Sequence, residues 1–344
     1  MHLKKSITIT VIIFIMAIGS WELYWRSQGY LPNIEDDKAL WAVQRALVER
    51  ASKNDIVLFG SSRVLFDFQL DAFEKETGIR PIQLATAGAS PLPGFRDLVE
   101  KTTFNGTVIL GVTPGLFFST TYPMASPWNR IQSRVNYFYD RTYAQRINNI
   151  LSIPLQSNFA FLRADDEEWS DDLNLKSLIS RIKIGNRTNN QIPPFYRFSD
   201  IDLDRNVKMS DKTEKDTAFA NTIIKVWGYF GSTSPPPDKE STMAFFMEDV
   251  ERFTARGGNL ILVRCPSSGG VRVGENMAFP RSDFWDDLIS KTNVKSYHFE
   301  DYEQLKHFEC PEWSHLSAKD AMFYTRELCK IMKNDGALFN LNRN

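Results

Sequence analysis

Short apolar runs alternate with amphipathic stretches along most of this chain. The apolar runs lie at residues 56–59, 81–84, 108–112 and 260–263, and residues 294–299 are predicted to be a fifth strand. The segments between them carry apolar residues at helical spacing and are predicted to be helices, at residues 36–51, 69–77, 94–103 and 241–256, with a final helix after Ser317. Strands that are buried on both faces read as unbroken apolar runs. The pattern therefore predicts an α/β fold in which a parallel central sheet is flanked by helices.

Two of the predicted helices carry more specific signals. In the helix that begins at Asp36, Leu40, Val43 and Leu47 recur on one face, and we expect that face to be buried. Ser317, followed three residues later by Asp320, matches a capping box at the start of the final helix.

The first residues of the chain carry a membrane signal. Lys4 and Lys5 precede a run from Ile7 to Trp21 without a charged residue, and aromatic residues follow it up to Arg26. Such a run suits either a retained membrane anchor or the apolar part of a signal peptide that is removed. Aromatic residues next to an arginine are typical of a membrane interface, which favours the anchor. Lys4 and Lys5 are then expected to stay in the cytoplasm while the rest of the chain is exported.

Regular alternation stops after Pro114. Residues 115–240 are predicted to be an insertion after the third strand, and a proline run at 235–237 marks its end. We expect its aromatic residues to form its core in preference to a platform for sugars. The chain is thereby divided into an N-terminal membrane anchor or signal segment at residues 1–26, a linker at 27–35 and an α/β domain at 36–340.

Composition narrows the range of functions. The chain has 344 residues, 42% of them hydrophobic, and can bury a large core. A formal net charge of −1 without a long basic run gives no electrostatic basis for binding nucleic acid. Neither the three cysteines nor the four histidines are spaced as zinc ligands, so no metal and no cofactor are expected.

The cysteines allow two interpretations. Cys265 ends the fourth predicted strand and Cys310 lies in the loop after the fifth, so these two could form a disulfide in an exported protein. The alternative, which we favour, is three unpaired thiols, with Cys329 buried on the final helix.

Two distant segments carry the candidate chemistry. The first predicted strand ends in Gly60, Ser61 and Ser62, and near the end of the chain Glu312 stands three residues before His315. A serine becomes a nucleophile when a base takes its proton, and a carboxylate can orient that base. Both segments are expected at the carboxyl ends of parallel strands, where ligands bind. Two alternatives stay open, a helix cap for Ser62 and a core position for His315.

The other histidines of the exported part are less promising. His298 falls in the fifth predicted strand and His307 in a loop. Structural or exposed roles are expected for both.

These segments resemble the SGNH (GDSL-like) hydrolase superfamily, and in particular its membrane-anchored periplasmic branch associated with polysaccharide O-acylation. In that superfamily a Gly-Asp-Ser turn after the first strand supplies the nucleophile. The resemblance assigns this role to Ser62 and puts Ser61 at the Asp position. Gly88 matches the glycine whose N–H faces the oxyanion, and Glu312 and His315 match the final Asp-x-x-His block.

The resemblance covers residues 50–114 and 240–335, implies an SGNH-hydrolase or flavodoxin-like sheet, and has two departures. Where the superfamily has an oxyanion-binding asparagine in Gly-x-Asn, this chain has Thr113, which offers only a hydroxyl. Losing one oxyanion donor typically slows a reaction by about 10²–10³. The second departure is Glu312 in place of Asp, one methylene longer but acceptable for an orienting group.

The resemblance implies a serine acyl-esterase or O-acyltransferase that acts on acyl esters, acetyl above all, of a cell-surface polysaccharide or other acylated glycan. Ser62 would attack the carbonyl, His315 would act as base, and Glu312 would orient it. The oxyanion would be held by Ser62, Gly88 and Thr113. The protein would lie in a bacterial inner membrane as a single-pass protein with its main domain periplasmic or extracellular, beside a membrane-bound O-acyltransferase as partner. The departures leave open a weakly active or inactive accessory protein that binds glycan or docks that partner.

Overall fold

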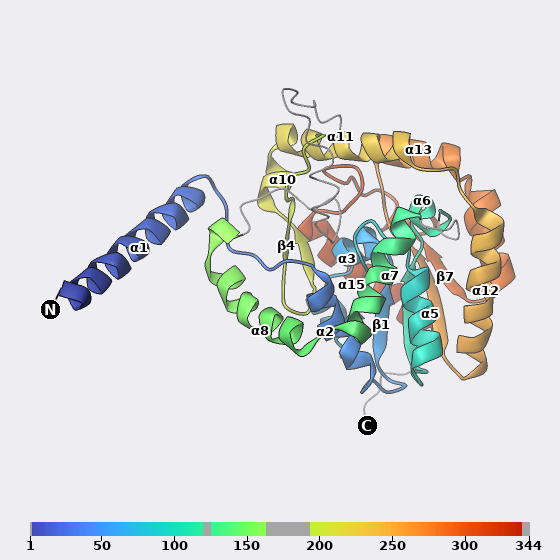
Figure 1. Cartoon of the computed structure of the whole chain (residues 1–344). Coiled ribbons are helices and arrows are strands. Elements are labelled where there is room, and N and C mark those ends of the chain that lie inside the picture. The colour runs from blue at the N-terminus through green and yellow to red at the C-terminus, as the bar shows by residue number, and fades with distance from the viewer. Residues whose placement is uncertain (1, 120–124, 163–192, 339–344) are drawn as a thin grey trace.

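The computed structural model describes residues 2–119, 125–162 and 193–338 (Figure 1). Within them lies a five-stranded sheet in which every neighbouring pair of strands is parallel. In sheet order the strands are β2 (Ile82–Gln83), β1 (Ile56–Phe59), β3 (Thr107–Gly111), β6 (Asn259–Arg264) and β7 (Lys295–His298). All five coincide with strands predicted from the sequence, so the α/β class with a parallel sheet is confirmed. The order is that of a doubly wound sheet, whose switch point lies between β1 and β3.

Helices cover both faces of this sheet. Along β1, Ile56 and Leu58 point into one apolar core, whereas Val57 and Phe59 point into the other. The first core is closed by α3 (Ser62–Asp67), α4 (Leu70–Thr77) and α15 (Ala318–Asn334). The second is closed by α2 (Lys38–Val48), α5 (Leu92–Lys101), α7 (Ser126–Asp140), α12 (Lys239–Ala255) and α14 (Asp287–Thr292).

The chain between β3 and α12 does not form a separate core in the residues described. Its elements are α6 (Pro114–Phe117), α7, α8 (Tyr143–Asn158), η1 (Ala160–Leu162), the hairpin β4 (Ser199–Ile201) and β5 (Val207–Met209), α10 (Asp211–Lys215) and α11 (Thr217–Thr233). Phe198 and Ile223 join the core under the first face of the sheet, and Trp128 packs against the other. The expectation that its aromatic residues form a core of their own is therefore wrong for these residues. The parts of the predicted insertion at 120–124 and 163–192 lie outside the described residues.

The remaining elements lie around β6 and β7. They are α13 (Gly269–Ala278), the π-helical turn η2 (Ser282–Asp286) and η3 (Phe299–Asp301). At the start of α15, the Ser317 hydroxyl accepts a hydrogen bond from the Asp320 N–H at 3.1 Å, as the capping pattern predicts.

The N-terminal segment is one long helix, α1 (His2–Ser27), which extends away from the body (Figure 1). Residues Leu3–Ser27 are long and apolar enough to cross a bilayer, with a mean hydropathy of 1.9 and none of that window buried. The helix continues through the predicted aromatic segment, where the rings of Trp21, Tyr24 and Trp25 pack on one another.

The buried face of α2 differs from the predicted one. Leu40 is buried as predicted, but Val43 and Leu47 are exposed, while Trp41 and Arg45 are fully buried. Both are drawn in by partners distant in sequence: the Trp41 indole donates to the Leu84 carbonyl at 3.1 Å, and Arg45 donates to Asp97 at 2.5 Å. Polar contacts therefore rotate the helix away from the face that its aliphatic residues would select.

The three cysteines are free and buried. A Cys265–Cys310 bridge is absent; Cys265 lies beside the Tyr324 hydroxyl and Cys310 beside Ser268. Of the two interpretations left open by the sequence, the structure has the unpaired thiols.

Arg205 fastens the β4–β5 hairpin to the edge of the sheet. Its guanidinium is fully buried and donates to both carboxylate oxygens of Asp36, at 2.6 and 2.9 Å. It also donates to the carbonyl oxygens of Gln83 and Ala85 at 2.8 and 2.7 Å. Burial would raise the pKa of Asp36, but the charges of Arg205 and Arg134 hold it below its usual value.

We therefore expect Arg205→Leu to lower the free energy of unfolding by about 3–5 kcal/mol, because it leaves the carbonyls of Gln83 and Ala85 without their donor and the partly buried Asp36 carboxylate with Arg134 as its remaining partner. Arg80→Leu is the matched control, since Arg80 pairs with Asp204 next to Arg205 but lies at the surface. It should cost at most about 1 kcal/mol. Urea denaturation of the protein in detergent measures both, and equal losses would contradict the role of Arg205.

Candidate functional site

The serines follow β1 at the carboxyl edge of the sheet. Ser61 is buried, and its hydroxyl is 2.7 Å from the Thr113 hydroxyl, which follows the neighbouring strand β3. This hydrogen bond joins two of the strand ends that the sequence predicts at one edge.

Ser62 begins α3, a helix that the sequence analysis missed because it treated the serines as a turn. The Ser61 side chain caps this helix by accepting from the Arg63 N–H at 3.4 Å. Two glycines let α3 lie close to the sheet: a Cβ at Gly60 or Gly111 would come within 2.3 or 2.1 Å of the Val64 side chain. Any larger residue at either strand end would push the helix, and Ser62 with it, away from the sheet.

His315 is held in one orientation by Glu312. The Glu312 carboxylate lies 3.0 Å from His315 Nδ1 and accepts from the His315 backbone N–H at 2.6 Å. Both side chains are buried. Because the carboxylate accepts, the proton of a neutral ring lies on Nδ1, which leaves Nε2 with the lone pair that a base needs.

Helix α3 contacts the segment that carries His315 through two hydrogen bonds and one ring contact. Arg63 donates to the Ser314 carbonyl at 3.2 Å, and Asp67 accepts from the Leu316 N–H at 3.1 Å. Between them, the Phe66 ring packs on the His315 ring with 4.4 Å between centroids. Burial raises the pKa of Asp67 well above its usual value.

Ser62 lies on the same helix as the residues that contact the histidine segment. Ser62 and Phe66 are four residues apart and therefore share one face of α3. Neither the Ser62 hydroxyl nor His315 Nε2 has a hydrogen-bond partner among the described residues, so the two are not bonded to each other. The hydrogen bond predicted between them is absent, and their joint role in catalysis stays a prediction.

Residues of the predicted insertion complete the surroundings of His315. The Trp227 indole N–H, on α11, donates to the second oxygen of Glu312. The rings of Trp227 and Phe198 both lie 5.7 Å from the His315 ring. Helical spacing of apolar residues up to Phe230 indicates that α11 has a buried face, but no local signal connects Trp227 with Glu312.

The predicted oxyanion donors lie at the same edge. The Ser62 N–H belongs to the first turn of α3, where backbone donors lack helical partners. Gly88 has a φ of +61°, and its N–H makes no hydrogen bond to the described residues. Arg130 lies directly over it, donating to the Ala87 carbonyl at 3.2 Å. The Thr113 hydroxyl is engaged with Ser61.

A buried ion-pair network extends from α3 toward β6. Arg63 makes a two-point contact with Glu275 at 3.1 and 2.7 Å, and Arg264 reaches the same carboxylate at 2.5 Å. Burial would raise the pKa of Glu275, but the charges of Arg264 and Arg63 lower it to about 2. Glu275 is therefore ionised at any physiological pH.

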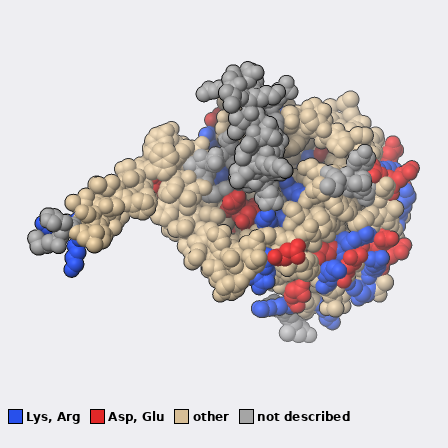
Figure 2. Space-filling model, in the orientation of Figure 1, with Lys and Arg blue, Asp and Glu red and all other residues tan. Residues whose placement is uncertain are grey.

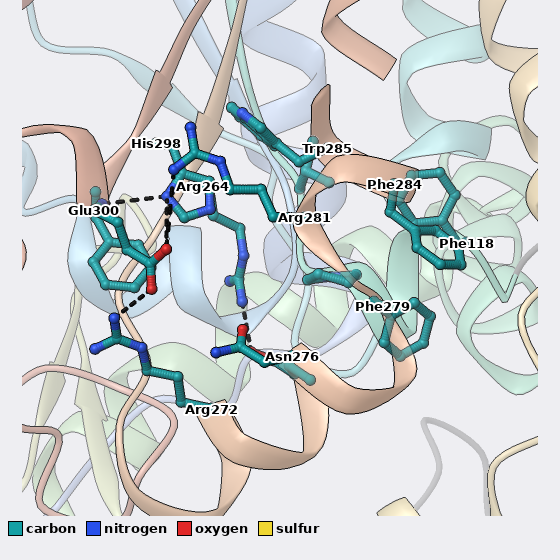
Figure 3. Close-up of a pocket in the computed structure, with 14 residues that line it drawn as sticks. Phe118, Arg264, Arg272, Asn276, Phe279, Arg281, Phe284, Trp285, His298 and Glu300 are labelled. Atoms are coloured by element: carbon teal, nitrogen blue, oxygen red, sulfur yellow. Dashed lines mark hydrogen bonds and ion pairs between the residues drawn. The ribbon is translucent and has the colours of Figure 1, made fainter. Parts of the chain in front are cut away.

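The network leads into a pocket beyond the ends of β3, β6 and β7 (Figure 3). Polar side chains of Arg264, Arg272, Arg281, His298 and Glu300 line one side. The rings of Phe118, Phe279, Phe284 and Trp285 gather on the other. Val112 and Pro114, on either side of Thr113 in sequence, also line the pocket, whereas Ser61, Ser62 and His315 are not among its lining residues.

His298 lines this pocket, whereas the sequence predicted only a structural or exposed role for it. Burial and then the charges of Arg264, Arg281 and Arg272 lower its pKa to about 2, so the ring is neutral. Its Nδ1 accepts from the Glu300 N–H at 3.2 Å, which leaves the proton on Nε2. His307, in contrast, is exposed and pairs with Glu303.

Comparisons with known proteins add no assignment: no protein-family model matches this chain, and no curated protein matches its sequence. Within the described residues, no group of three or more His, Cys, Asp and Glu side chains is placed to hold a metal ion. The candidate site therefore rests on its geometry.

The two buried histidines should have opposite tautomers. With ¹⁵N-labelled histidine at neutral pH, we expect His315 to carry its proton on Nδ1 and His298 on Nε2, because Glu312 accepts at one ring and the Glu300 N–H donates at the other. Proton–nitrogen NMR spectra of the protein in detergent measure this directly. Glu312→Ala should remove the slowly exchanging Nδ1–H signal of His315 and leave His298 unchanged. An Nε2–H tautomer at His315 would contradict the arrangement.

Proposed function

We propose that this protein is a serine acyl-esterase or O-acyltransferase of the SGNH type. The observation that carries the proposal is the buried Glu312–His315 pair, which leaves Nε2 free to act as a base; the His315 ring packs on Phe66, one helical turn from Ser62. The alignment of Ser62 and Phe66 on one face of α3 supports it further.

The chemistry follows from these roles. Ser62 Oγ bonds to the ester carbonyl carbon while its proton passes to His315 Nε2. The tetrahedral oxyanion is held by the N–H groups of Ser62 and Gly88. The leaving alcohol takes the proton from His315, and the acyl group remains on Ser62. Water, for an esterase, or an acceptor hydroxyl, for a transferase, then gives its proton to His315 and attacks the acyl carbon. The bond to Ser62 Oγ breaks, and Oγ takes the proton back from His315.

We propose an acylated glycan, with acetyl as the acyl group, as the substrate. The neighbouring pocket supports this class because it combines aromatic rings with several planar polar side chains, a lining that suits a ring bearing hydroxyl groups. Helix α1 supports a place at a membrane, and a membrane-bound O-acyltransferase is the partner that the resemblance suggests.

A second candidate, a non-catalytic accessory protein that binds glycan or docks that partner, is favoured by one observation. His315 Nε2 is buried among rings and makes no hydrogen bond with Ser62 in the described structure.

Substitution of the two serines separates the candidates. For an enzyme, Ser62→Ala should lower the rate of p-nitrophenyl acetate hydrolysis by at least about 10³-fold, as loss of a nucleophile does. Ser61→Ala should stay within about tenfold, the effect of one neutral hydrogen bond. Both variants are assayed as full-length protein in detergent, with thermal unfolding as a check on folding, and then on acetylated polysaccharide. Equal rates for Ser62→Ala and the parent protein would favour the accessory role.

We further propose that α1 anchors the protein in a bacterial inner membrane with Lys4 and Lys5 inside and the main domain outside. A reporter that is active only outside the cytoplasm should give signal when it is fused after residue 40. The full-length protein should stay in the membrane pellet after a high-salt wash. A soluble product with a new N-terminus near Ser20 would instead show that the segment is a cleaved signal.

A further inference from the structure

Helix α8 has its polar face toward the body and its apolar face outward, the reverse of a typical surface helix of a water-soluble domain. Its intermediate, body-facing positions include polar Asn149, Ser152 and Gln156, and Gln156 accepts from the Glu35 N–H at 2.9 Å. None of its residues is buried. A surface helix normally buries its apolar stripe and exposes its polar one.

The exposed stripe of α8 is apolar and continuous. Its members recur at helical spacing and are between 36% and 79% exposed: Tyr143, Ile147, Ile150, Leu151 and Leu155. A contiguous apolar patch of this kind marks a surface that contacts an apolar partner.

The position of α8 identifies that partner. The end of α8 is tied to the end of α1, because Arg26 donates to the Asn158 carbonyl at 3.0 Å and Glu22 accepts from the Ala160 N–H at 2.9 Å. Glu22 and Arg26 lie within the aromatic segment of α1, where a membrane-spanning helix meets the interface. The carboxyl end of α8 is therefore held at the depth of the membrane surface.

The direction of α8 agrees with this position. In Figure 1 it runs from the end of α1 at a steep angle to the α1 axis, as a helix lying on the bilayer does relative to one crossing it. In Figure 2 the surface beside α1 is largely uncharged and continues from α1 onto the adjoining part of the body.

We propose that α8 lies in the membrane interface, with its apolar stripe in contact with the lipid acyl chains and its polar face against the protein. The inference depends on α1 as the anchor and is independent of the catalytic proposal. Arg146 is the only charged residue of α8, so the contact depends on apolar area and needs no anionic lipid. Together, α1 and α8 attach the body to the membrane at two places and fix its orientation.

A fluorophore on α8 tests this in the full-length protein reconstituted into phosphatidylcholine nanodiscs. The three native thiols are buried, so the parent protein serves as the labelling background. With an environment-sensitive dye at Ile150→Cys or Leu151→Cys, we expect a blue-shifted emission that doxyl-labelled lipid quenches, unchanged in high salt. Met277→Cys on α13 is the matched control, because Met277 is as exposed and apolar but lies far from α1 (Figure 1). Its emission should be neither shifted nor quenched.

Two results would overturn the proposal. An emission wavelength at positions 150 and 151 equal to that at position 277 would show that the apolar stripe lies in water. A blue shift without quenching by labelled lipid would show that protein, either another part of this chain or a second copy, covers it instead.

Discussion

The candidate site depends on the hydrogen bonds between α3 and the loop around His315. Arg63 and Ser314 are 251 residues apart in sequence, yet their hydrogen bond and the one between Asp67 and Leu316 hold the peptide groups on both sides of the histidine. Buried backbone groups that lose such partners cost about 1–3 kcal/mol each. Ser62 and His315 therefore belong to one rigid unit, since any movement of α3 displaces both.

The ionised groups that pack next to this unit keep their charges over the physiological pH range. Glu275 neutralises Arg63 and Arg264 in a buried place, where an unpaired ion would be costly. Because the pKa of Glu275 is lowered to about 2, the network does not titrate over the physiological range. It also joins the start of α3 to the pocket at the ends of β6 and β7, so His315, Ser62 and the pocket share one support.

The segment between β3 and α12 packs against the elements that hold the candidate site. Arg205 fastens the β4–β5 hairpin to the sheet edge, and Trp227 donates to the carboxylate that orients His315. The same stretch contains α8, whose polar face meets the body while its apolar stripe faces outward. One stretch of chain thus connects the surroundings of α1 with the histidine.

The sequence by itself determined the features that depend on neighbouring residues: the five strands, the capped start of α15, and the contact between Glu312 and His315, which three residues of spacing make almost unavoidable. It did not reveal α3, because six residues are too few for a periodic signal. The buried face of α2 was predicted wrongly because Arg45 is drawn inward by Asp97, a partner 52 residues away. Only the tertiary structure decided the presence of α3, the buried face of α2 and the contact of Trp227 with Glu312. The reason is that hydrogen bonds between buried groups form wherever the fold brings partners together, whatever their distance along the chain.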